Sequence, residues 1–142
     1  FFAESLDTFA ADIQRARPTV FFAVPRIWSK FYQKVCEKMP PHKLERLLKI
    51  PIIRGIVKKK LLSALGLDQC RLALSGAAAL SPELINWYNR LGIEILEVYG
   101  MTENMAWSHT TRAGDQKVGY VGKVNPGVEC RIGGTAEIGR AA

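Results

Sequence analysis

The start of the chain has apolar residues first at helical spacing and then in a continuous run typical of a buried strand. Apolar side chains recur at helical spacing from Leu6 to Arg15, and Pro18 then forces the chain out of the helix. The stretch Thr19–Val24 holds β-branched and aromatic residues without polar alternation. This pattern is typical of a strand that is covered on both faces, as in parallel sheets. We therefore expect a helix followed by a buried strand.

The next segment has the pattern of an amphipathic, basic helix. Pro25 suits its first turn, where the missing N–H costs nothing, and Pro40-Pro41 ends it. One face is apolar and another is basic: the apolar face holds Trp28, Phe31, Val35 and Met39, and the basic face holds Arg26, Lys30, Lys34 and Lys38. We expect Trp28 and Phe31 to lie in the core rather than in a ligand site.

Helices and strands continue to alternate up to about residue 105. The expected elements are helices over about His42–Leu48 and Ile52–Leu65, a helix opened by the capping sequence Ser81-Pro82-Glu83, and strands over Arg71–Ser75 and Glu94–Val98. We therefore expect an α/β fold, with a parallel sheet and flanking helices over about residues 1–105. A tail of loops and short strands is expected over about residues 106–142, because glycines punctuate its short apolar segments.

Composition places the chain among globular proteins and excludes several other classes. Its 142 residues are 48% hydrophobic and 23% charged, so one ordinary domain is expected. No apolar stretch approaches the roughly 20 residues that span a bilayer. The scattered Cys36, Cys70 and Cys130 exclude a disulfide framework and a zinc site of paired cysteines, and they favour a reducing cytoplasm.

The net charge of +7 is concentrated in one segment. Arg26–Lys60 contains eleven lysine or arginine residues and only two glutamates. Three interpretations are open: a solvated helical face, a surface for anionic membranes, or a nucleic-acid site. No groove-reading motif accompanies the charge, so we expect no nucleic-acid partner. Peripheral association with an anionic membrane through Arg26–Lys60 is the functional alternative to a solvated face.

Two loops that follow predicted strands carry the candidate chemistry. Gly76–Ala79 consists of small residues, which allow a ligand to lie against the backbone. In the second loop, Tyr99 offers a flat ring for stacking, and Gly100 permits a tight turn. Thr102 has a hydroxyl for a phosphate oxygen, and Glu103 has a hard carboxylate suited to Mg²⁺. A plain turn with a buried tyrosine and a capping Thr-x-Asn sequence is the alternative for this loop.

Four sequence motifs occur in a characteristic order along the chain. They are Pro18–Trp28, Cys70–Ala78 followed by Leu80-Ser81, Tyr99–Glu103, and Val118–Gly122 with Pro126-Gly127. From Phe2 to Ile132 the chain thereby resembles the adenylate-forming superfamily, and within it the fatty acyl-CoA synthetases. The resemblance implies a ligase that condenses a fatty acid with ATP to an acyl-adenylate and then passes the acyl group to coenzyme A. ATP, Mg²⁺ and coenzyme A as co-substrate are the implied cofactors.

The resemblance also implies roles for the residues of the two loops. The cofactor-binding residues that it implies are Gly76, Ala77, Ala78, Tyr99, Gly100, Met101 and Thr102. Among them, Tyr99 is implied to stack on adenine, and the small residues to line the adenine and acyl side of the pocket. Thr102 is implied to hydrogen-bond the phosphate and Glu103 to bind Mg²⁺, so these two are the expected catalytic residues.

The resemblance further implies that the chain is a fragment of the N-terminal AMP-binding domain of a larger enzyme. The family's phosphate loop is expected upstream of Phe1, and its ribose-binding aspartate and C-terminal domain beyond Ala142. The isolated fragment is therefore expected to be inactive, and the missing parts of the parent chain are its expected partners. Val98 stands where the family often has glycine beside the acyl channel, which leaves the acyl length open, and Ala79 replaces a usual proline.

Two other functional classes stay open beside the fatty acid–CoA ligase. The first is another adenylating enzyme, one that activates aryl or amino acids or that is luciferase-like, because the adenylating half-reaction and the Tyr99–Glu103 loop are shared. The second is a stand-alone basic α/β module that binds anionic membranes or partners without catalysis.

Overall fold

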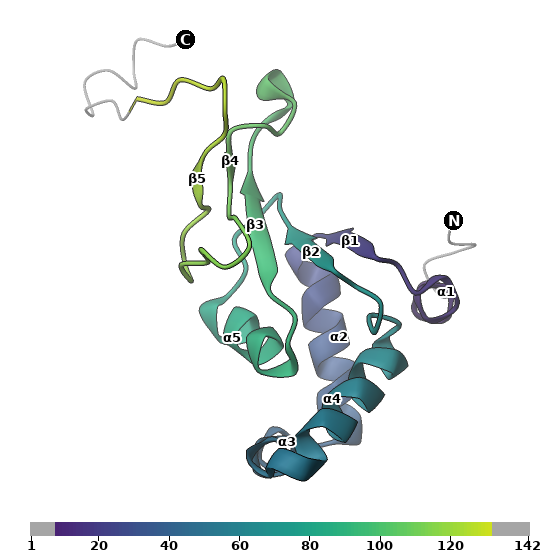
Figure 1. Cartoon of the computed structure of the whole chain (residues 1–142). Helices are drawn as coiled ribbons and strands as arrows, with labels where there is room; N and C mark the ends of the chain where they lie inside the picture. The colour runs from purple at the N-terminus through teal and green to yellow at the C-terminus, as the bar shows by residue number, and fades with distance from the viewer. Residues whose placement is uncertain (1–7, 132–142) are drawn as a thin grey trace.

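Three parallel strands form the centre of the fold. A computed structural model of the chain describes residues 8–131. In it β1 (Val20–Ala23) pairs with β2 (Leu72–Ser75), and β2 pairs with β3 (Ile95–Tyr99). The two-residue strands β4 (His109–Thr110) and β5 (Lys123–Val124) add antiparallel pairs beyond β3, so the sheet order is β1-β2-β3-β4-β5 (Figure 1). The expected α/β fold with a parallel sheet and a tail of short strands is confirmed.

The helices lie within a few residues of their expected positions. They are α1 (Phe9–Ala16), α2 (Pro25–Lys38), α3 (Pro41–Lys49), α4 (Pro51–Leu65) and α5 (Pro82–Leu91), followed by the 3₁₀ turn η1 (Thr102–Asn104). The expected cap of α5 is present, because the Ser81 hydroxyl accepts a hydrogen bond of 3.3 Å from the Leu84 N–H. The expected helix start at Leu6 and the last eleven residues of the expected tail lie outside the described residues.

One face of the parallel sheet is covered and the other is open, so the expectation that Thr19–Val24 is covered on both faces is wrong for the described residues. Phe21 and Ala23 are buried, whereas Val20 and Phe22 are 56% and 58% exposed. The parallel strands follow one another in the order β1-β2-β3 across the sheet. Because both connections run in the same direction across the sheet and such crossovers are right-handed, the helices of both connections lie on the same face. The helices α2 and α5 accordingly pack against each other and against β1 and β3.

Aromatic side chains form the centre of the core between the sheet and its helices. Trp28 and Phe31 are 0% and 5% exposed, which confirms that they belong to the core. The Trp28 ring makes edge contacts with Phe21 and Tyr88, at centroid distances of 5.1 and 5.0 Å. The Trp28 indole N–H donates to the Ala23 carbonyl at 3.2 Å, and the Tyr88 hydroxyl donates to the Trp28 carbonyl at 2.8 Å. These bonds tie α2 to both β1 and α5.

Replacing Tyr88 by phenylalanine tests this link. Burial raises the pKa of Tyr88 far above its usual range, so its hydroxyl stays protonated and donates at any pH at which the protein is studied. Loss of the hydrogen bond should lower the free energy of unfolding by about 1 kcal/mol, as measured by urea denaturation. The exposed Tyr120 is the control, and Tyr120→Phe should leave stability unchanged. Equal stability of the two variants would contradict the role given to Tyr88.

The helices α3 and α4 form a hairpin at the end of the molecule remote from η1 (Figure 1). Among residues 8–131, no helix combines the length and the apolar character needed to cross a bilayer.

Candidate functional site

The two loops singled out in the sequence meet at one edge of the sheet. Because β2 and β3 are parallel neighbours, their carboxyl ends lie side by side. A pocket of about 290 Å³ opens between the loops that follow them. It is lined by Ala77, Ala78, Ala79, Glu97, Val98, Tyr99, Gly100 and Val121. Four of the expected cofactor-binding residues, Ala77, Ala78, Tyr99 and Gly100, are therefore brought together.

The first loop supplies a wall of small residues. Gly76 precedes this wall without lining the pocket, and it is buried. A Cβ at Gly76 would lie 3.1 Å from the Val98 carbonyl oxygen and 3.3 Å from the Phe22 ring, so a larger residue has little room. Ala77 has a left-handed backbone with φ of 70°, which costs an alanine about 1 kcal/mol. The loop is thus held close to the backbone of β3 in a conformation that the surrounding structure imposes.

Tyr99 and Gly100 form the opposite wall, at the end of β3. The Tyr99 side chain is 47% exposed, so the alternative of a buried tyrosine is wrong. Its ring meets the edge of the His109 ring at a centroid distance of 5.8 Å. His109 in turn lies with Nδ1 at 2.8 Å from the Ser108 hydroxyl. The contact with His109 covers one side of the Tyr99 ring, and the side that lines the pocket stays free for a ligand.

Gly100 allows the chain to fold back on itself after β3. A Cβ at this position would overlap the backbone of Ala106, so only glycine fits without a shift of the loop. The turn is closed by the Asn104 side chain, whose Oδ1 accepts from the Met101 N–H at 2.8 Å. The Ala106 N–H donates to the Met101 carbonyl at 2.8 Å. The expected tight turn is confirmed, and Asn104 is the residue of the Thr-x-Asn sequence whose side chain caps it.

Met101, Thr102 and Glu103 do not line the pocket. All three are exposed and belong to the turn that leads into and forms η1. Within residues 8–131, Glu103 makes no ion pair, and no group of three or more His, Cys, Asp or Glu side chains could hold a metal ion. A single carboxylate is nevertheless the protein ligand that Mg²⁺ commonly has when substrate phosphates supply the rest. Glu103 fits that arrangement.

Glu97 is a pocket residue that the sequence analysis missed. It is buried, and its Oε1 accepts from the Leu80 N–H at 3.1 Å, so it joins β3 to the end of the first loop. The sequence pattern that could have indicated Glu97 is a carboxylate within the apolar strand Ile95–Tyr99. A carboxylate buried in such a strand needs a hydrogen-bond partner, and this requirement marks it as a residue with a specific role. Val121 was also missed as a lining residue, although it lies in one of the four motifs.

The chain is similar to known proteins over most of its length. Residues 2–139 match a family described as AMP-binding enzyme. A long-chain-fatty-acid–CoA ligase of Mycobacterium bovis is 30% identical over 148 residues, which are 86% of this chain and 24% of the ligase. Long-chain-fatty-acid–CoA ligase 5 of Rattus norvegicus is 30% identical over 140 residues, 86% of this chain and 20% of the ligase.

A solved structure resembles the fold. The A-PCP didomain of carboxylic acid reductase from Segniliparus rugosus, in complex with AMP, superposes with a TM-score of 0.55. It is 28% identical and covers 79% of this chain, which spans 15% of the reductase chain. The chain also spans only about a fifth to a quarter of the length of the two ligases.

Proposed function

Because this chain belongs to the family of AMP-binding enzymes, we propose that it is the nucleotide-binding part of an ATP-dependent fatty-acid–CoA ligase. The pocket between the carboxyl ends of β2 and β3 is the observation that carries the proposal. It pairs a flat aromatic ring with a wall of alanines, which suits a planar base. The names of the ligases from Mycobacterium bovis and Rattus norvegicus support a fatty acid as the substrate.

The proposed reaction has two steps. A fatty-acid carboxylate oxygen attacks the α-phosphorus of ATP, the bond to pyrophosphate breaks, and an acyl-adenylate forms. The thiol of coenzyme A then loses its proton, its sulfur attacks the acyl carbon, and AMP leaves. Neither step requires a nucleophile from the protein, so the protein contributes alignment and stabilisation of phosphate charge.

The described residues divide these tasks between the two loops. Tyr99 would stack on adenine, and Ala77 and Ala78 would line the opposite wall. The Thr102 hydroxyl would donate to a phosphate oxygen. Glu103 would hold Mg²⁺, which when bound offsets phosphate charge. Thr102 and Glu103 are exposed, so their side chains can approach phosphates that extend out of the pocket.

The rest of the catalytic machinery is proposed to lie outside this chain. Its relatives are about four to five times as long, which supports the view that residues 1–142 are a fragment and inactive alone. A cytoplasmic location with peripheral membrane contact through Arg26–Lys60 is a further proposal. The exposed Ile52 and Ile56 lie on α4 beside Lys59 and Lys60, and this mixture of apolar and basic side chains suits an anionic membrane surface.

Nucleotide binding by Tyr99 variants tests the proposal. In the complete protein, Tyr99→Ala should weaken AMP binding by about tenfold, because stacking on an aromatic ring contributes about 1–3 kcal/mol per base. Tyr99→Phe keeps the ring and should bind AMP as tightly as the wild type. Calorimetric titration gives both affinities. Equal affinity of wild type and Tyr99→Ala would show that adenine does not stack on this residue.

A further inference from the structure

A second and larger cavity lies among α3, α4 and α5. It has a volume of about 580 Å³ and is lined by Glu45, Leu48, Lys49, Arg54, Lys58, Asn89 and Arg90. None of these residues lines the pocket at the ends of β2 and β3. The α3–α4 hairpin stands at the end of the molecule remote from η1 (Figure 1), so this cavity is a separate site.

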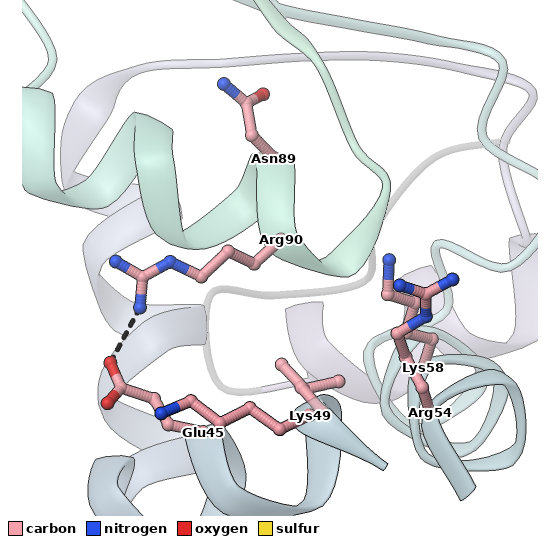
Figure 2. Close-up of a pocket in the computed structure, with 7 residues that line it drawn as sticks. Glu45, Lys49, Arg54, Lys58, Asn89 and Arg90 are labelled. Atoms are coloured by element: carbon pink, nitrogen blue, oxygen red, sulfur yellow. Dashed lines mark hydrogen bonds and ion pairs between the residues drawn. The ribbon is translucent and has the colours of Figure 1, made fainter. Parts of the chain in front are cut away.

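Positive charge dominates this cavity. Four of its lining side chains are cationic, and one, Glu45, is anionic. Figure 2 shows Arg90 reaching from α5 to Glu45 on α3, where the two side chains form an ion pair of 2.6 Å. Within residues 8–131, no ion pair involves Lys49, Arg54 or Lys58. The cavity thus holds four cations against one carboxylate, and that carboxylate is already paired with Arg90.

The sequence around the cavity concentrates this charge further. No Asp or Glu occurs between Glu45 and Asp68, whereas six Lys or Arg residues do. Arg54 and Lys58 are one helical turn apart and project from the same side of α4 (Figure 2). Like charges that share a cavity repel one another, and an anion placed among them relieves the repulsion.

We propose that this cavity binds a ligand that carries two or more phosphate groups. An arginine guanidinium donates two parallel N–H bonds to a phosphate, and a lysine adds a compact charge. Arg54 on α4 and Arg90 on α5 both line the cavity, so cationic groups are present on two of its helices. Its volume lies in the range of small-molecule sites, which is about 300–1,000 Å³. A soluble diphosphate and a lipid head group that carries several phosphates, such as an inositol bisphosphate, offer this same chemistry.

Inorganic pyrophosphate is the probe for a soluble ligand. Titrated without Mg²⁺ into the complete protein in the presence of saturating AMP, it should bind saturably at one site and raise the melting temperature. The double variant Arg54→Glu/Lys58→Glu should weaken binding by at least about tenfold, because it removes two charge-assisted contacts and places two negative charges beside the phosphates. The milder Arg54→Gln/Lys58→Gln should weaken it less, and circular dichroism verifies that both variants fold.

Two controls separate this site from general electrostatics and from the nucleotide pocket. Lys30→Glu/Lys38→Glu makes the same change of charge at exposed positions of α2 outside the cavity, and it should leave binding nearly unchanged. Saturating AMP fills the proposed nucleotide pocket, so pyrophosphate that still binds does so outside that pocket. A failure of the proposed phosphate site can therefore be distinguished from a failure of the proposed ligase function.

Vesicles of phosphatidylcholine with phosphatidylinositol bisphosphate, a lipid that carries several phosphate groups, test the lipid source. Vesicle binding that pyrophosphate displaces would assign the cavity to a head group, and pyrophosphate binding without vesicle binding would assign it to a soluble ligand. The inference is overturned if neither probe binds saturably. It is also overturned if Arg54→Glu/Lys58→Glu binds the probes as tightly as Lys30→Glu/Lys38→Glu.

Discussion

Replacing Glu103 by alanine in the complete protein should lower the rate of adenylate formation by about a hundredfold to a thousandfold, as expected when one group that stabilises transition-state charge is removed. Glu103 is exposed and, within residues 8–131, belongs to no ion pair, so its loss should leave the melting temperature unchanged. A large kinetic effect without a loss of stability is therefore the signature of a group that acts on the substrate. Fatty-acid-dependent exchange between pyrophosphate and ATP measures the rate.

Glu37 provides the matched control for this variant. It is also an exposed glutamate, but it lies on α2 far from η1 in the chain, and it lines neither cavity described above. Glu37→Ala should exchange pyrophosphate at the wild-type rate. If Glu103→Ala does the same, the carboxylate does not hold the metal and the role given to it is wrong.

Replacing Gly100 by alanine should weaken AMP binding by about tenfold or more, equivalent to at least about 1.4 kcal/mol. The new Cβ would overlap the backbone of Ala106, so the turn between Tyr99 and η1 has to shift. Tyr99, which immediately precedes Gly100, would then be displaced. The free energy of unfolding should also fall, by about 1–3 kcal/mol, because overpacking strains the native backbone.

Gly55 is the control for the glycine variant. It lies on the exposed side of α4, and a Cβ there would meet nothing within 4 Å. Gly55→Ala should raise the free energy of unfolding by about 0.5–1 kcal/mol, because alanine favours a helix. Its AMP affinity should equal that of the wild type. Wild-type affinity in Gly100→Ala would contradict the view that this turn shapes the nucleotide pocket.

Local signals in the sequence were sufficient to predict most elements of the fold. Proline at a first helical turn marks the starts of α2 and α5, and Gly66 in the left-handed conformation ends α4. The exposure of the faces of β1 could not be predicted in the same way. An apolar strand indicates that both faces can be buried, but the direction of the crossovers decides which face the helices of this chain cover.

The site was predictable as two loops but not as a pocket. The small residues after β2 and Tyr99 after β3 could be found because the carboxyl ends of parallel strands meet. Glu97 was visible as a carboxylate within an apolar strand, but its partner, the Leu80 N–H, could not be predicted because Leu80 is distant in sequence. The cavity lined by Arg54 and Arg90 could not be predicted from the sequence either. The basic composition of Arg26–Lys60 was visible, but the contribution of α5 depends on tertiary packing.

Fatty-acid-dependent exchange of labelled pyrophosphate into ATP, measured on the complete protein, tests the central claim most directly. The account predicts exchange that requires both a fatty acid and Mg²⁺, that is lost in Glu103→Ala and that is retained in Glu37→Ala. Absence of exchange with short, medium and long fatty acids would contradict the ligase proposal. Exchange with aryl or amino acids instead would assign the same adenylating pocket to a different substrate.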